Sequence, residues 1–240
     1  MQIKSETVEI SELTLRQRKE MLKLMRDYFK GVGRASFEKD LSEKQWAVIL
    51  SDENGSVCGF TTLVLSEAVV AGEKLKVFYS GDTIVDKKHW GIFSLEKRWI
   101  PFVFENVLSD PGFKWYWFFV SKGYRTFRYL PVHFKKYWPS PENSSCTFEN
   151  KLLNTLAGIR FGKSYDPLAG VVCCENDYRL RSGVGDISDR EMRCKHVRFF
   201  LEKNPCWRKG AQLACLTELS VGNLRPMLLK MLRKELRIET

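Results

Sequence analysis

The sequence has no long hydrophobic run and no signal-peptide pattern at its start. Over 240 residues, no apolar stretch approaches the roughly 20 residues that a helix needs to cross a bilayer. The first residues include Lys4, Glu6 and Glu9, whereas a signal peptide has a basic start followed by an apolar centre. We therefore expect a cytoplasmic protein without a membrane span.

Regularly spaced cysteines are also missing. The seven cysteines are odd in number, and no CxxC pair occurs. Cys173 and Cys174 are adjacent, which does not suit an ordinary pair of metal ligands, and the sequence shows no base partner that would make either a nucleophile. We expect reduced, mostly buried thiols and no metal cofactor.

Acidic residues are too few to balance the basic ones. The chain has 39 Lys and Arg against 29 Asp and Glu, so its net charge is +10. This charge favours acidic partners, which include a phosphate-rich cofactor, an acidic carrier protein, anionic lipid and nucleic acid. The basic residues are scattered along the chain, so a solvated positive surface is an equally good interpretation.

Residues 77–95 contain the pattern around which the other elements can be arranged. Val77 to Val85 alternate and are rich in β-formers, a short basic loop with Gly91 follows, and a helical pattern begins near Leu95. A strand that leads through such a loop into a helix offers backbone N–H groups and a positive dipole end to an anion such as a pyrophosphate. The pattern is common, so it does not identify a function by itself.

The elements before this loop are predicted from periodicity and turn residues. The turn at Asn54-Gly55 suits a tight hairpin because both residues accept positive φ values. The predicted elements are an edge strand over residues 2–10, a helix capped by Ser11 or Thr14 that ends near Gly31, a helix over Ser36–Glu43, and antiparallel strands over Trp46–Leu50, Val57–Leu65 and Lys76–Val85.

The chain after the loop continues with alternating helices and strands. Leu95, Trp99 and Val103 mark a helix face, and Pro101 means that this helix starts late or is kinked. Trp115–Val120 is nearly all apolar, as in a strand buried on both faces. A helical stretch over Tyr124–Tyr137 is expected to be interrupted by Pro131. The remaining predictions are helices over Glu149–Ile159 and Arg190–Glu202, strands over Val171–Cys174 and Gln212–Leu219, loops over residues 139–145 and 182–189, and an amphipathic C-terminal helix with Leu224, Leu228, Met231 and Leu232.

This order of elements resembles the GNAT (Gcn5-related N-acetyltransferase) superfamily. The resemblance covers about Ile3 to Tyr137 and the strand near Gln212–Leu219, and Trp117 to Thr126 is similar to the fifth-strand region of atypical members. It implies an α+β, three-layer fold with a mixed, mostly antiparallel central sheet flanked by helices. We expect one such domain over residues 1–240, with a helical extension over about 220–240.

The resemblance also implies a donor site. In this family a (Q/R)-x-x-G-x-(G/A) loop after the fourth strand holds the pyrophosphate of acyl-coenzyme A, whereas the matching stretch here has Lys88 first, one glycine and Phe93 last. The implied donor contacts are Ile84, Val85, Lys87, Lys88, Trp90, Gly91, Ile92 and Phe93. Two alternatives stay open: acetyl- or longer acyl-coenzyme A binds with fewer backbone contacts, or the acyl thioester arrives on an acidic carrier protein that the basic chain attracts.

Acyl transfer to an amine needs a base for the amine, a polarised thioester carbonyl and an acid for the leaving thiolate. Asp82, at the end of the strand before the loop, is the candidate base, and the resemblance implies Tyr124 as the acid. A carboxylate bonded within its strand and a packed aromatic ring are the competing interpretations. His89 can contact a phosphate or move a proton, although an exposed loop histidine without a role is the alternative.

Ser80, Tyr79 and His133 are the candidates for contact with the substrate. Ser80 can position a carbonyl or simply let a ligand approach the strand, and His133 either faces the acceptor or is structural. The aromatic density of Trp115–Phe119 and Phe127–Trp138 suits a thick core and also a groove for a fatty acyl chain. We prefer a long acyl donor because it also explains the relaxed pyrophosphate loop.

Two other functions stay open. The chain can be a GNAT-like protein without catalysis that acts as a scaffold or ligand sensor. It can also be a nucleic-acid-binding module, because basic and aromatic residues alternate between Lys122 and His133, but no RNP, KH or zinc signature supports this. The sequence does not identify the amine acceptor, which can be a small molecule or a peptide side chain.

Overall fold

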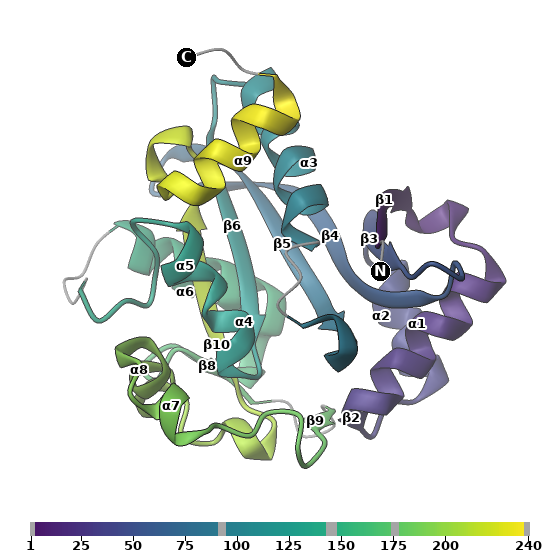
Figure 1. Cartoon of the computed structure of the whole chain (residues 1–240). Coiled ribbons are helices and arrows are strands. Elements are labelled where there is room, and N and C mark those ends of the chain that lie inside the picture. Colours follow the sequence, from purple (N-terminus) through teal and green to yellow (C-terminus); the bar gives the residue numbers. More distant parts are fainter. Residues whose placement is uncertain (1–2, 91–94, 143–147, 174–177, 238–240) are drawn as a thin grey trace.

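The computed structural model describes residues 3–90, 95–142, 148–173 and 178–237 (Figure 1). Its centre is an eight-stranded sheet in the order β1-β3-β4-β5-β6-β10-β8-β7. The strands are β1 (Lys4–Glu9), β3 (Trp46–Ser51), β4 (Val57–Val70), β5 (Glu73–Val85), β6 (Lys114–Ser121), β7 (Tyr165–Asp166), β8 (Val171–Val172) and β10 (Gln212–Glu218). Within this sheet β5 and β6 run parallel, and every other neighbouring pair is antiparallel.

Helices cover both faces of the sheet. One face carries α1 (Leu15–Tyr28), α2 (Arg34–Ser42) and α6 (Phe148–Phe161), which pack on residues such as Phe60 and Val64 of β4. The other face carries α3 (Leu95–Ser109), α4 (Tyr124–Phe127), α5 (Tyr129–His133), α8 (Lys195–Lys203) and α9 (Pro226–Leu236). The predicted α+β fold class, with a mostly antiparallel central sheet flanked by helices, is therefore confirmed.

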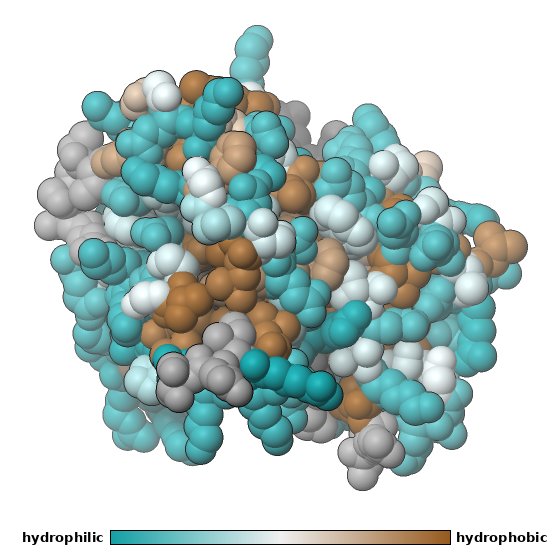
Figure 2. All heavy atoms as spheres, turned by 90° about the horizontal axis from the view of Figure 1, so that it is seen from above, coloured by the Kyte–Doolittle hydropathy of each residue, from teal (hydrophilic) through white to brown (hydrophobic). Residues whose placement is uncertain are grey.

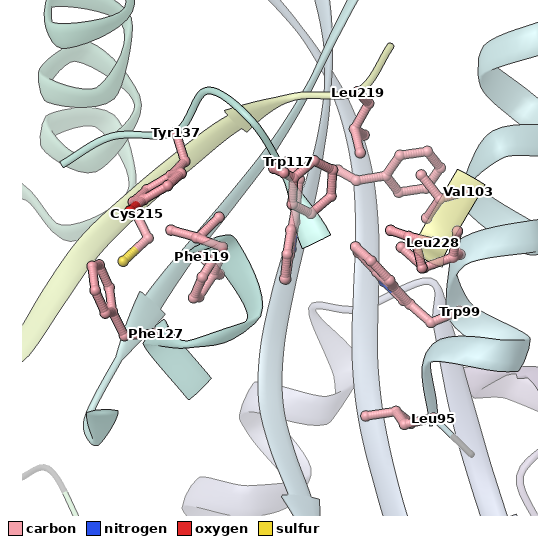
Figure 3. Close-up of a cluster of buried hydrophobic side chains, with 14 of the residues drawn as sticks. Leu95, Trp99, Val103, Trp117, Phe119, Phe127, Tyr137, Cys215, Leu219 and Leu228 are labelled. Atoms are coloured by element: carbon pink, nitrogen blue, oxygen red, sulfur yellow. The ribbon is translucent and has the colours of Figure 1, made fainter. Parts of the chain in front are cut away.

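The larger core lies between β6 and the helices α3 and α9. Figure 3 shows Trp99 and Val103 of α3 and Leu228 of α9 meeting Trp117 of β6. The ring centroids of Trp99 and Trp117 are 4.3 Å apart. Most of the aromatic side chains of Trp115–Phe119 and Phe127–Trp138 are buried in the core. This agrees with the interpretation of these aromatic residues as parts of a thick hydrophobic core.

Local sequence signals explain the helix and hairpin boundaries. Thr14, not Ser11, caps α1, because its hydroxyl accepts from the Gln17 N–H and the Gln17 side chain accepts from the Thr14 N–H. The Asn54-Gly55 turn joins β3 to β4 as predicted, and Gly55 has φ of 73°. Pro101 lies inside α3, whose first turn begins at Leu95, so the helix does not start late.

Several predicted elements are wrong in extent: β4 runs on from Leu65 to Val70, and three helices differ. The helix expected over Tyr124–Tyr137 is divided into α4 and α5 and ends at His133, since Phe134 has extended backbone. The helix expected over Arg190–Glu202 is two helices, α7 (Asp189–Met192) and α8. The C-terminal helix begins at Pro226, so Leu224 precedes it.

A second, two-stranded sheet pairs β2 (Phe29–Lys30), which follows α1, with β9 (Arg179–Leu180). The segment between α6 and β10 thus reaches across to the end of α1, as Figure 1 shows at the lower edge of the molecule. The prediction of mostly buried thiols is wrong for the described cysteines: Cys58 and Cys215 are buried, Cys194 is half-buried, and Cys173 and Cys206 are exposed.

Candidate active site

A β-bulge on β5 separates the two parallel strands at the centre of the sheet. Thr61 lies opposite Thr83 and Leu63 opposite Ser80, so Thr62 faces both Gly81 and Asp82. The ladder between β5 and β6 ends at the pair Ser80 and Phe119. Beyond it, β5 stays paired with β4 and β6 stays paired with β10, so the two strands part.

The bulge is packed so closely that position 81 requires glycine. A Cβ atom on Gly81 would lie 2.6 Å from Thr62 Oγ1 and 2.7 Å from Lys44 Cε. The Lys44 side chain has no exposed surface, and its ammonium group donates to Asp40 Oδ1 at 2.7 Å and to the Asp40 carbonyl at 3.0 Å. An ion pair between buried Lys44 and half-buried Asp40 therefore supports the point where the strands diverge.

A cleft of about 740 Å³ opens where β5 and β6 part. This volume is typical of a site for a small molecule or cofactor. On one face of the sheet the cleft reaches Asp40 and Phe161, and on the other it reaches Glu96, His133 and Met227. Figure 2 views the end of the molecule that carries α9, not the end of β5 at which the cleft opens, and shows there an apolar area within a largely hydrophilic surface.

The structure brings most of the predicted site residues together in this cleft. The predicted residues that line it are Tyr79, Ser80, Asp82, Ile84, Val85, His89, Trp90, Tyr124 and His133. Lys87 and Lys88 belong to the short turn next to the cleft but do not line it. Gly91, Ile92 and Phe93, on which the pyrophosphate prediction depends most, lie outside the described residues.

Tyr124 is held by a carboxylate from a distant segment. Its ring is buried, and its hydroxyl donates to Glu191 of α7, whose Oε1 also lies 3.2 Å from Arg125 Nη1. Burial and this hydrogen bond raise the pKa of Tyr124 well above its usual value. Tyr124 can therefore protonate a thiolate only if its hydroxyl breaks the hydrogen bond to Glu191. The position of Tyr124 in the sequence did not indicate this contact.

His89 is buried, so the alternative of an exposed loop histidine is wrong. Its Nδ1 atom has no hydrogen-bond partner among the described residues, although the side chain lines the cleft. The turn that carries it is held by Asp86, which accepts from the Lys88 N–H at 2.9 Å, and by Trp90, whose Nε1 donates to the Val85 carbonyl at 2.7 Å. His89 thus offers a ligand a hydrogen-bonding nitrogen in a fixed position.

Ser80 and Tyr79 point to opposite faces of β5 and have different surroundings. Ser80 Oγ accepts a hydrogen bond of 2.8 Å from Trp117 Nε1. The Tyr79 ring lies under the guanidinium of Arg160, at 3.7 Å from the ring centroid. Burial raises the pKa of the Tyr79 phenol to about 12, although Arg160 acts in the opposite direction.

The cleft has basic residues on the side of β6 and α4. Lys122, Arg125 and Arg128 line it there, and the Arg125 guanidinium lies 4.5 Å from the centroid of the Trp90 ring. These residues suit an anionic group such as a phosphate. Sequence reasoning noticed them only as part of a possible nucleic-acid surface, because their common position depends on the fold.

An acidic side chain that the sequence analysis missed also lines the cleft. Glu96 of α3 lines the cleft with 12% of its side chain exposed, and its Oε1 is 3.8 Å from His133 Nε2. In the sequence, Glu96 is only an acidic residue in the first turn of a helix, where the helix dipole alone explains it. Its contact with His133, 37 positions away, leaves no pattern in the sequence.

Within the described residues, no group of three or more His, Cys, Asp or Glu side chains could hold a metal ion. In the same part of the chain, no helix is both long and apolar enough to cross a membrane.

Comparisons with known proteins give only distant matches. No family model and no curated protein matches the chain. Among solved structures, it is similar to a probable N-acyltransferase of unknown function from Enterococcus faecalis V583, with 11% identity, a TM-score of 0.42, and coverage of 57% of this chain but only 33% of that one. It is also similar to the GNAT family N-acetyltransferase YhbS from Escherichia coli in complex with CoA (19% identity, TM-score 0.36, 54% and 69% coverage). A third match is glucosamine-6-phosphate N-acetyltransferase from Arabidopsis thaliana (17% identity, TM-score 0.34, 45% and 76% coverage).

Proposed function

We propose that this chain is a divergent GNAT-type N-acyltransferase that moves an acyl group from a coenzyme A thioester to an amine. The observation that carries the proposal is the bulge at Gly81 and Asp82, which parts the parallel strands β5 and β6 and opens the cleft there. Past Ser80 and Phe119 the two strands no longer bond to each other, so their facing edges offer backbone groups to a ligand. Such groups can bind a donor or polarise a thioester carbonyl.

The donor site is proposed on the basic side of the cleft. Lys122, Arg125 and Arg128 would bind phosphate groups, and His89 Nδ1 would bond to the donor. Of the predicted loop contacts, His89 and Trp90 line the cleft with these basic residues. An acyl-carrier thioester is the alternative donor, and the +10 charge is its support.

The chain length of the acyl group is a separate part of the proposal. Most of the aromatic residues once considered for a fatty-acyl groove are packed in the core. The aromatic side chains that line the cleft, among them Tyr79, Trp90, Phe119 and Tyr129, would contact a longer chain. We therefore keep a fatty acyl group as a hypothesis and test it against acetyl.

Asp82 is proposed to accept the amine proton and Tyr124 to protonate the leaving thiolate. The amine nitrogen would form a bond to the carbonyl carbon, the carbon–sulfur bond would break, and the thiolate would take a proton. Asp82 lines the cleft at the bulge, and Tyr124 lines it at the start of α4. Glu191 would keep the Tyr124 proton in place until the thiolate forms.

Calorimetric titration with acetyl-, octanoyl- and palmitoyl-coenzyme A, followed by transfer of labelled acyl groups to an amine panel, tests the proposal. We expect Asp82→Asn and Tyr124→Phe to retain donor binding and to lose at least about 100-fold in turnover, the usual contribution of acid–base groups. Asp189→Asn, exposed on α7, and Tyr116→Phe, buried away from the cleft, are matched controls. Absence of binding to all three donors would exclude coenzyme A, and binding without turnover would favour the scaffold or sensor alternative.

A further inference from the structure

The short helix α7 lies next to α4, which carries basic residues of the cleft (Figure 1). It follows a segment that forms part of the cleft wall, whose lining residues are Tyr178, Leu180, Val184 and Gly185. The pairing of β9 with β2 fixes this segment near its start. After α7, the helix α8 packs in the larger core and fixes the chain again. The helix α7 is therefore the middle of a segment with two fixed ends.

A few polar bonds, and no buried side chain, hold α7 in place. None of its residues is buried, so apolar packing contributes little to its position. Glu191 joins it to α4: its carboxylate accepts from the Tyr124 hydroxyl, and its Oε1 lies 3.2 Å from Arg125 Nη1. Arg198 of α8 donates to two backbone carbonyls at the C-terminal end of α7, at 3.0 and 3.2 Å. We call the two bonds of Glu191 the α7–α4 contact.

The α7–α4 contact uses a cation that also lines the cleft. The Arg125 guanidinium contacts both Glu191 and the Trp90 ring, and Trp90 lines the same cleft. Although burial alone would raise the pKa of Glu191, its hydrogen bonds and Arg125 lower it to about 2, so the side chain is ionised at neutral pH. An internal carboxylate therefore uses part of the Arg125 fork that a phosphate would use. A phosphate on the same guanidinium would also place two like charges side by side, and these repel.

We propose that Glu191 is an internal competitor for the anion site of the cleft, and that a phosphate group of a ligand binds by taking Arg125 from Glu191. The phosphate group contacts Arg125 from the cleft, which Lys122 and Arg128 also line. The helix α7 then has only the Tyr124 bond to α4, and it becomes more mobile. This inference rests on the proposed donor site, but it is testable without acyl transfer.

Such competition affects which anions occupy the cleft. It lowers the affinity for any anion that needs Arg125, so free phosphate binds poorly. A donor with further contacts along the cleft still binds, because those contacts offset the loss of the Glu191 bond.

The test is calorimetric titration of the full chain with pyrophosphate, for the wild type and for Glu191→Gln. Glutamine still fits the capping box with Ser188, so the variant removes the charge and keeps α7. We expect pyrophosphate to bind about two- to fivefold more tightly to Glu191→Gln. The gain is small because the Arg125 side chain is 40% exposed, and such ion pairs are weak.

Two further variants show whether the gain depends on Arg125. Arg125→Gln should weaken pyrophosphate binding, and the addition of Glu191→Gln to this variant should have no further effect. Asp189→Asn, which removes an exposed negative charge from the same helix, is the matched control and should leave the affinity unchanged.

Hydrogen exchange of the peptide over residues 188–194 gives a second readout. Pyrophosphate should speed exchange in this peptide of the wild type, because it loosens α7, and should not do so in Glu191→Gln. A ligand that only stabilised the fold would slow exchange instead.

Several results would overturn the inference. They are equal or weaker pyrophosphate binding in Glu191→Gln, an equal gain in Asp189→Asn, slower exchange of residues 188–194 on binding, or no pyrophosphate binding to any of these proteins. Coenzyme A titration and labelled acyl transfer in parallel separate the two proposals. The expected gain for pyrophosphate without coenzyme A binding or transfer would support the competition and exclude the acyltransferase function.

Discussion

Replacement of Gly81 by alanine tests whether the bulge creates the site. The new Cβ would lie 2.6 Å from Thr62 Oγ1 and 2.7 Å from Lys44 Cε, both well inside normal contact distance. Lys44 cannot swing away without breaking its bonds to Asp40, because its side chain is fully enclosed. We expect a loss of about 2–3 kcal/mol in the free energy of unfolding, the upper part of the range for overpacking. For a chain of this size, this corresponds to a fall in Tm of about 4–12 °C.

The same substitution should weaken donor binding, since β5 must shift where it parts from β6. Urea denaturation and coenzyme A calorimetry are the assays. Gly158→Ala is the control, because nothing lies within 4 Å of a Cβ at that position in α6 and alanine favours a helix. Thr62→Ala removes an oxygen that has no hydrogen-bond partner in the described chain and that the new Cβ would touch. The double variant, with both Gly81→Ala and Thr62→Ala, should therefore lose about 1 kcal/mol less stability than the sum of the two single losses. A Gly81→Ala protein within about 0.5 kcal/mol of wild type, with additive effects, would refute the reasoning.

Two further predictions concern the hydrogen bonds around the cleft. Although burial alone would raise the pKa of Glu191, hydrogen bonds from Tyr124 and Ser188 and the charge of Arg125 lower it from 4.5 to about 2. The carboxylate therefore contributes stability above about pH 4.5, and this contribution is lost as the pH falls toward 2. Glu191→Gln should lower the free energy of unfolding by up to about 2 kcal/mol at pH 7 and by much less at pH 3. Denaturation curves of variant and wild type that differ equally at both pH values would contradict this. Ser80→Ala should lower the free energy of unfolding by about 1–3 kcal/mol, measured by urea denaturation, because it leaves the buried Trp117 Nε1 without an acceptor. An unchanged midpoint would show that another group accepts the Trp117 N–H.

The cleft carries charges of both signs. Basic residues gather at the end of β6 and on α4, and the carboxylate of Glu96 on α3 lies near His133 of α5. The helices α3, α4 and α5 all cover the same face of the sheet, next to the gap where β5 and β6 part.

Much of the fold could be predicted because its signals are local. The Thr14 cap, the Asn54-Gly55 turn, the apolar run of β6 and the periodic face of α9 each depend on a few neighbouring residues. Their order along the chain was enough to indicate a mixed, mostly antiparallel sheet between helices. The candidate residues on β5 between Tyr79 and Val85 line one cleft because they are neighbours on a single strand.

Only the tertiary structure decided how the site is completed. The bulge at Gly81 exists because Thr62 and Lys44 pack against it, and neither residue is near it in the sequence. Tyr124 meets Glu191 67 residues later, and Glu96 meets His133 only because α3 and α5 cover the same face of the sheet. Contacts between distant segments follow from packing geometry and leave no periodic mark on the chain. The sequence by itself therefore determined most of the elements and their order, and packing decided which charges face the cleft.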